Sequence, residues 1–396
     1  MQKIYLVLLL ILLTGCTPSQ VAALPCVLSP QDMPATWRPD GETQRRLPAG
    51  PWTEREAADA TYAITTGLNE MVNLYKERPA AVEDLWEDSV ASLIEVTYSN
   101  ASPASISATA TDAARRNLDQ LIRPYLERDP AKAACNEYDE LLPLAAYAYK
   151  QFDAKDPRAA ATLSLTNASF ADCGSLTKAI GMDYPRLLSS NKVTLEEAFD
   201  LVIWSLLFIE GQVVPGLDLP AEAKAMPARL WDFLRTYRLP NADEYSDGAE
   251  NDEFIEAAYL ATHIAYIPTG NHRYPLYVED SQPLYDFHRE NFYAVLEMGE
   301  LDLVAEFVDS LRQYGCTPGN DLQVRDGTRY LLGVFHGGRD RWMNYREPGE
   351  ADAEVETYDF IHKAWTGVLG VRDRAIESPE PGTYGGVVRS WLPVPQ

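Results

Sequence analysis

Apolar residues recur every three to four positions through most of the chain, which is the spacing of helices that bury one face. The pattern predicts about a dozen helices, near residues 53–78, 80–98, 104–127, 131–152, 157–169, 195–211, 221–237, 252–267, 282–298, 301–314, 320–336 and 352–369. The alternation that is typical of strands persists nowhere for long, and no hairpin signal recurs. The sequence therefore predicts an all-α fold.

The predicted helix ends agree with this pattern. Thr53 and Thr194 are each followed three residues later by glutamate, which is the signature of a capping box at a helix start. Gly315 and the glycine pair 337–338 stand where helices should end. Because most connections are short, successive helices should form antiparallel hairpins that build an irregular bundle, a solenoid or a closed toroid. No fixed-period repeat is visible, which disfavours a regular solenoid.

The N-terminus has the form of a secretory signal. A basic start precedes an apolar run over residues 4–13, and Thr14, Gly15 and Cys16 follow. The ending Leu13-Thr14-Gly15-Cys16 resembles the lipobox of bacterial lipoproteins. The resemblance implies that residues 1–15 are a signal peptide and that Cys16 is lipidated and becomes the mature N-terminus, bound to a membrane through its acyl chains. In such lipoproteins an aspartate after the lipidated cysteine keeps the protein in the inner membrane. This chain has Thr17 there, so the resemblance implies the outer membrane, on its periplasmic or surface side.

The remainder divides into three parts. Residues 16–52 contain seven prolines, from Pro18 to Pro51, and are expected to form an extended tether whose later part, with Cys26, Trp37 and Trp52, lies against the domain. Residues 53–377 form the α-helical domain, with a possible internal boundary at the acidic segment 240–251. The proline-rich tail 378–396 is expected to wrap over the surface without a helix.

The net charge and the cysteine content limit which molecules the protein is expected to bind. The chain carries 59 acidic against 34 basic residues, a formal net charge of −25, so nucleic acid and anionic lipid surfaces are poor partners. Besides Cys16 there are four cysteines, which permit two disulfides in three connectivities or four free thiols. These cysteines are Cys26, Cys135, Cys173 and Cys316. Their wide spacing disfavours a zinc or haem site, and no cofactor is expected.

All five histidines lie between residues 263 and 362, so polar chemistry is expected in the C-terminal third. On the predicted helix 252–267, apolar residues occupy most faces, and the polar residues fall on one narrow stripe. That stripe contains Glu256, Tyr259, His263 and Tyr266. In a toroid of helices it would line the central cavity, where Tyr259 or Tyr266 could act with His263 as acid and base. The alternative is that the stripe faces solvent or a hydrogen-bonded neighbour.

Two further groups of residues are candidates for a functional site. On the last helix, Tyr358, His362 and Trp365 are one-turn neighbours, and His362 joins the catalytic candidates. The loop after His336 carries Arg339 and Arg341.

With Arg325, Arg329 and Arg346, that loop forms an arginine cluster in a strongly acidic chain. Its guanidinium groups could bind a carboxylate-bearing ligand, or they could form internal salt bridges. Glu210, at the end of an apolar stretch, is either a carboxyl with a raised pKa or a solvated acid near the helix end. No sequence motif for a metal is present, although His263, His336 and His362 could meet in space.

Three short segments resemble an uncharacterised bacterial family of helical domains. They are residues 259–266 (YLATHIAY), which resemble its Thr-His helix, residues 299–306 (GELDLVAE), which are similar to a helix start, and Tyr358 to His362, which resemble its closing histidine segment. The resemblance implies a helical domain over about residues 250–370 and supports His263 and His362 as site residues. It implies no particular reaction.

These observations leave three hypotheses for function. The first is a membrane-anchored binding or scaffold module of the cell envelope, whose partner is an envelope protein. The second is a helical-toroid enzyme that acts on an acidic saccharide or peptide through Tyr/His acid–base chemistry and binds it at Arg339, Arg341 and His336. The third is a metal-binding helical protein that uses the histidines.

Overall fold

The computed structural model describes residues 25–98, 103–190, 193–346, 357–373 and 377–392. The signal peptide and Cys16 lie outside these residues. The predicted all-α fold is confirmed, because the described residues form 17 α-helices and short 3-10 turns and contain no strand. None of these helices is both long and apolar enough to cross a membrane.

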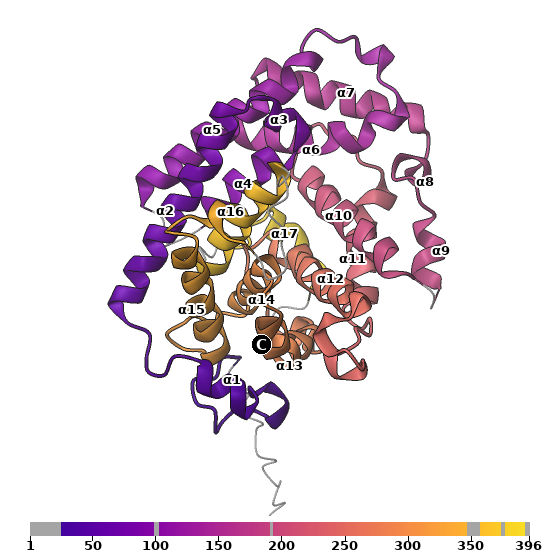
Figure 1. Ribbon diagram of the computed structural model, residues 1–396. Helices are drawn as coiled ribbons and strands as arrows, with labels where there is room; N and C mark the ends of the chain where they lie inside the picture. Colours follow the sequence, from indigo (N-terminus) through magenta and orange to yellow (C-terminus); the bar gives the residue numbers. More distant parts are fainter. Residues whose placement is uncertain (1–24, 99–102, 191–192, 347–356, 374–376, 393–396) are drawn as a thin grey trace, which may run out of the picture.

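Twelve of the helices form two concentric rings, so the fold is a toroid of helical hairpins (Figure 1). The inner helices are α4 (Asp88–Val96), α6 (Tyr138–Gln151), α10 (Leu195–Gln212), α12 (Asp252–Thr269), α14 (Leu301–Gln313) and α16 (Thr357–Val371). The outer helices are α2 (Glu54–Glu77), α5 (Ala104–Ile122), α7 (Pro157–Cys173), α11 (Ala221–Leu234), α13 (Gln282–Met298) and α15 (Leu322–Gly337). Outer and inner helices alternate along the chain.

Packing around the ring explains its closure. Inner neighbours pack in the order α6, α10, α12, α14, α16 and α4, and α5 packs against both α4 and α6 where the ring closes. The outer helices α11, α13, α15 and α2 likewise each pack against two inner helices. Inner helices are therefore covered by protein on their outward sides, which is why α14 is buried over nearly its whole length.

Close helix crossings depend on glycine. A Cβ on Gly370 of α16 would lie 2.4 Å from Leu331 Cδ1 and 2.7 Å from Ala305 Cβ. Gly370 therefore permits the close approach of α16 to both α14 and α15.

The helix boundaries differ most from prediction at two places. The helix expected over 80–98 is divided into α3 (Ala80–Asp84) and α4, because Trp86 between them has a left-handed backbone, with φ of 48°. The helix expected from residue 131 begins only at Tyr138, after two 3-10 turns. Short helices α8 (Leu176–Ala179) and α9 (Tyr184–Ser189) were not predicted.

The expected pair of disulfides is present, and their connectivity is now defined. Cys26 is bonded to Cys316, and Cys135 is bonded to Cys173. The first joins positions 290 residues apart, and the second joins positions 38 residues apart. The first disulfide therefore fixes the N-terminal part of the described chain to the loop between α14 and α15.

Residues 25–52, which we call the N-terminal strap, fold back on the toroid. Cys26, Trp37 and Trp52 pack against the core, as expected, and the Trp37 ring meets Tyr285 of α13 edge-on at 5.6 Å. The strap is not an extended spacer, since it contains α1 (Gly41–Arg46), whose start is capped by Asp40. That expectation was wrong for residues 25–52.

The C-terminal tail also differs from prediction, because it contains the short helix α17 (Tyr384–Arg389). The Tyr384 hydroxyl donates a hydrogen bond of 2.6 Å to the carbonyl oxygen of Ile267 on α12, and Arg389 pairs with Asp280 at 3.1 Å. These tertiary contacts hold a helix that has only 6 residues. Residues 240–251, the expected internal boundary, contain two 3-10 turns that connect α11 to α12.

Candidate functional site

A cavity of about 490 Å³ occupies the centre of the toroid, and all six inner helices or their ends contribute to its lining. Its polar lining consists of six carboxylic acids, two histidines, four tyrosines and one asparagine, together with Thr366 and Trp365. The acids are Glu87, Asp88, Glu95, Glu210, Asp302 and Glu306. A volume of this size falls in the range of small-molecule sites.

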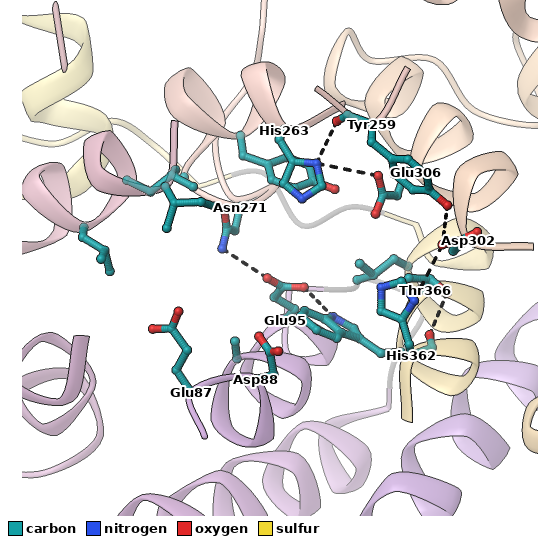
Figure 2. A pocket seen from close by; sticks show the side chains of 18 of the residues that line it. Glu87, Asp88, Glu95, Tyr259, His263, Asn271, Asp302, Glu306, His362 and Thr366 are labelled. Atoms are coloured by element: carbon teal, nitrogen blue, oxygen red, sulfur yellow. Dashed lines mark hydrogen bonds and ion pairs between the residues drawn. The ribbon is translucent and has the colours of Figure 1, made fainter. Parts of the chain in front are cut away.

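The α12 wall of the cavity is built around His263. Its Nδ1 lies 2.8 Å from the carbonyl oxygen of Tyr259, one turn earlier, and 3.9 Å from Glu306 Oε2 (Figure 2). The nearby Thr262 hydroxyl donates a 2.6 Å hydrogen bond to the same Glu306 oxygen. If Nδ1 donates to the Tyr259 carbonyl, the neutral ring carries its lone pair on Nε2.

A second hydrogen-bonded group connects three inner helices. The Tyr259 hydroxyl of α12 donates a 2.6 Å hydrogen bond to Asp302 Oδ2 of α14. His362 Nδ1 of α16 lies 3.7 Å from the same oxygen (Figure 2). Asp302 Oδ2 is therefore the acceptor at the centre of this group.

The α4 wall is acidic. Glu95 accepts hydrogen bonds from Asn271 Nδ2 at 3.2 Å and from Trp365 Nε1 at 2.7 Å. Glu87 and Asp88, at the start of α4, are also part of the lining (Figure 2).

Glu210 marks the end of α10 that faces the cavity, where it forms ion pairs with Lys150 at 2.6 Å and with Arg273. The prediction of a solvated acid at the helix end was wrong, because only 16% of the Glu210 side chain is exposed. Burial alone would raise its pKa, but the two cations outweigh burial and lower it.

Other groups in the lining have pKa values dominated by burial. Burial raises the pKa of Glu306 to about 8, and nearby Asp302, Asp309 and Glu95 add to the rise, although the hydrogen bond from Thr262 opposes it. Burial likewise raises the pKa of Glu95 to about 7. It lowers the pKa of His263 to about 4. At neutral pH the cavity therefore contains a protonated carboxylic acid beside an uncharged imidazole.

The structure brings together some of the residues singled out from the sequence. Tyr259, His263 and His362 all line the central cavity, as does Tyr266. Glu256 does not, because its side chain is exposed in a shallow groove beside the start of α10. Glu256 therefore lies apart from His263 and His362, although Tyr259 lines both the groove and the cavity.

The arginine cluster is also outside the cavity, and its members make internal contacts. Arg329 pairs with Glu56 at 2.6 Å, and Arg325 donates a 2.9 Å hydrogen bond to the carbonyl oxygen of Gly50 in the N-terminal strap. Arg341 lies 3.8 Å from Glu70.

The two remaining arginines, Arg339 and Arg346, are exposed, and so is His336 beside them. His336 pairs with Asp340 at 2.7 Å, and Arg339 is in a left-handed turn with φ of 59°. The expected ligand site at Arg339, Arg341 and His336 is therefore separate from the central cavity. Arg329 and Arg341 form internal salt bridges, which was the alternative expectation for the cluster.

Sequence reasoning missed most of the carboxylic acids in the cavity. Asp302 and Glu306 entered only as part of a helix start, although they stand four residues apart in a segment that is otherwise strongly apolar. Such a polar stripe on a buried helix is the signal that identified Tyr259 and His263, and it could have identified both acids. Glu87, Asp88 and Glu95 carry no such signal, because their place depends on the helix break at Trp86.

Metal ligation finds little support in the described part of the chain. The only grouping of histidine, cysteine and acidic residues with suitable spacing there is Cys26, Cys316 and Asp321, whose two sulfurs form a disulfide. His263 and His362 line the cavity but His336 does not, so the suggested cluster of three histidines does not form. Searches against protein-family models, curated proteins and solved structures found no match to this chain.

Proposed function

We propose that this protein is a membrane-anchored enzyme of the cell envelope that cleaves glycosidic bonds of a small saccharide in its central cavity. The observation that carries the proposal is a pair of carboxyl groups in different environments on one inner helix, Asp302 and Glu306 of α14. This proposal favours the enzyme hypothesis over a scaffold, because a scaffold has no need for a cavity lined by so many titratable groups.

The two acids stand four residues apart on the same helix, α14. Residues four apart on a helix have Cβ atoms about 5–6 Å apart. Retaining glycosidases place their two carboxyl groups about 5–5.5 Å apart, and inverting enzymes place them farther apart. Asp302 and Glu306 both reach the same cavity, so a sugar bound there could contact both.

The two acids would take different roles. Burial raises the pKa of Glu306 to about 8, so this acid keeps its proton at neutral pH. Glu306 would donate that proton to the oxygen of the leaving sugar. Asp302, oriented by Tyr259 and His362, would act on the anomeric carbon or on the attacking water. The bond between the anomeric carbon and the leaving oxygen breaks, and the oxygen of a water molecule bonds to that carbon. The proton that this water loses restores Glu306, either directly or by way of Asp302.

The lining also indicates which sugars would enter. Among the described residues, the cations beside the six acids are Lys150 and Arg273, which are both paired with Glu210, and Arg372, which lies near Glu95. An acidic saccharide would meet like charges there. A neutral or amine-bearing substrate therefore replaces the acidic one expected from the arginine cluster.

The test measures hydrolysis of neutral and amino di- and oligosaccharides, and of nitrophenyl glycosides, by the purified protein. Glu306→Gln and Asp302→Asn should each lower kcat by about 10²–10⁴-fold, the usual contribution of acid–base catalysis. Glu54→Gln, an exposed position on α2, is the matched control and should retain full activity. The proposal fails if no substrate is cleaved faster than in buffer, or if a folded Glu306→Gln variant is as active as the parent.

A further inference from the structure

Two acids at the start of α4 differ from the other acids of the cavity. Glu87 and Asp88 reach the lining, yet neither side chain accepts a hydrogen bond or forms an ion pair with any residue in the described ranges (Figure 2). The Glu87 Oε2 atom is fully buried and has no partner there. A buried carboxylate without a donor is costly, so such a group calls for an explanation.

Each of the other acids in the lining has at least one partner in the described part of the chain, although Glu210 Oε2 is also buried without a hydrogen bond. Glu210 has Lys150 and Arg273, and Glu95 has Asn271 and Trp365. Asp302 accepts from Tyr259, and Glu306 accepts from Thr262. Among the acids of the lining, only Glu87 and Asp88 therefore have no donor or cation as a partner in the described residues.

The backbone fixes the position of these two acids. The left-handed turn at Trp86 ends α3 and lets α4 begin at Asp88, which sets Glu87 and Asp88 at the edge of the cavity. A bulky residue with positive φ is unfavourable and persists only where the surrounding structure holds it. One turn along α4, the small side chain of Ala91 also lines the cavity and leaves space beside the acids.

Aromatic rings supply the rest of the surroundings. Tyr147 of α6 and Tyr358 and Trp365 of α16 line the same cavity. The charge on Glu87 contributes to raising the pKa of Tyr147, and the charge on Asp88 does the same for Tyr358, so each acid has a tyrosine within electrostatic range. Aromatic faces attract cations, as do carboxylates.

We propose that Glu87 and Asp88 form a subsite for a primary ammonium group of the ligand. The ammonium has three N–H donors and would supply the partners that both acids lack, while the tyrosine rings would contact its apolar carbons. This inference deepens the proposed function, and it depends on that function only for the cavity in which the ligand lies. An amino sugar and an aliphatic polyamine both present this chemistry.

The experiment is calorimetric titration of the full-length protein in detergent with three probes. These are the β-1,4-linked dimer of glucosamine, its fully N-acetylated counterpart and spermidine. The glucosamine dimer should bind at least tenfold more tightly than the N-acetylated dimer, because acetylation removes the charge and two of the donors. If spermidine binds as tightly as the glucosamine dimer, the subsite recognises the ammonium group that both share. If spermidine binds more tightly than the glucosamine dimer, the ligand is a polyamine.

Variants locate the effect. Glu87→Gln and Asp88→Asn, alone and together, should reduce the preference for the amine to less than twofold without lowering Tm. Glu196→Gln, an exposed position on α10, should leave the preference intact. Equal affinity for the two dimers, no binding of either amine, or an unchanged preference in the double variant would overturn the proposal.

The outcome is separable from that of the proposed function. Glu306→Gln lies outside the ammonium subsite and should retain the preference for the amine while hydrolysis is lost. Amine binding that depends on Glu87 without any hydrolysis supports the subsite and contradicts the enzyme. Hydrolysis of neutral sugars without amine binding supports the enzyme and contradicts the subsite.

Discussion

Glu210 and Glu306 are buried glutamates in the same cavity, but their pKa values move in opposite directions. Burial favours the protonated form of both. Glu210 has two cations as partners and stays ionised, whereas Glu306 faces other acids and the uncharged His263 and keeps its proton. The neighbours, rather than the depth of burial, therefore decide which of the two acids can donate a proton.

This difference predicts how stability depends on pH. Folded Glu306 keeps its proton up to about pH 8, whereas in the unfolded chain glutamate loses it near pH 4.3. Between these values the folded state binds more protons, so the free energy of unfolding falls as the pH rises. From pH 6.5 to pH 8, Glu306 alone should account for a loss of about 2 kcal/mol. Urea denaturation at the two pH values measures it.

The buried histidines contribute little to this change between pH 6.5 and pH 8. Burial lowers the pKa of His263 and His288 to about 4, so both are neutral in the folded protein, and they are mostly neutral in the unfolded chain above pH 6.5. Glu306→Gln should remove its share of the loss, while Glu54→Gln should retain all of it. An unchanged pH dependence in Glu306→Gln would show that Glu306 is already ionised at pH 6.5.

For individual residues, the sequence pattern identified the histidines and several tyrosines of the cavity but not their hydrogen-bond partners. Tyr259 and His263 share a helix stripe, so 3.6-residue periodicity was enough to place them on one face. Asp302 lies 43 residues from Tyr259, and only the closing of the ring brings the two together. The same limit explains why the arginine cluster was assigned to a ligand, since Glu56 and Arg329 are 273 residues apart.

Among the elements, long helices were predictable, and short ones were not. Capping boxes placed the starts of α2 and α10, as the structure confirms at Thr53 and Thr194. The short helices α8, α9 and α17 have 4 to 6 residues, too few to be stable alone, so only tertiary contacts explain them. The break at Trp86 has no glycine or proline to indicate it.

The contact of α16 with α14 and α15 allows a matched glycine test. Gly370→Ala would place a methyl group against Leu331 and the backbone of Ala305, and it should lower the free energy of unfolding by about 1–3 kcal/mol. Gly333→Ala, at an exposed position of α15, meets nothing within 4 Å and should raise it by up to about 1 kcal/mol. Denaturant unfolding of both variants measures the difference. Equal effects would mean that α16 does not approach its neighbours so closely.

For the whole molecule, the all-α class was predictable from periodicity, and a closed toroid was one of the arrangements left open. The ring is closed because α16 and α4 both pack against α2. This contact joins the last inner helix to the beginning of the domain. Contacts between such distant segments leave no local pattern in the sequence. The N-terminal strap shows the same limit, because its prolines suggested a spacer whereas Arg289, Arg325 and Cys316 hold it on the toroid.

The position of the strap shortens the membrane tether that the lipobox implies. If Cys16 carries the acyl chains, only the ten residue steps to Cys26 (16 to 26) separate the anchor from the disulfide to Cys316. A fully extended chain of that length spans at most about 35 Å. The toroid would therefore lie close to the bilayer, with the side that carries the loop between α14 and α15 nearest to it.

Replacement of the anchor tests this arrangement. Cys16→Ser should abolish labelling by radioactive palmitate and transfer the protein from the membrane to the soluble fraction, because acyl chains contribute about 0.8 kcal/mol of membrane binding per buried methylene. The double variant Cys26→Ser, Cys316→Ser is the control. It should keep its label and remain on the membrane, although loss of the disulfide should lower its stability by about 2–5 kcal/mol. Retention of the Cys16→Ser variant on the membrane, with the label unchanged, would mean that another part of the chain provides the attachment, and the toroid would then have no reason to face the bilayer with its disulfide-bonded side.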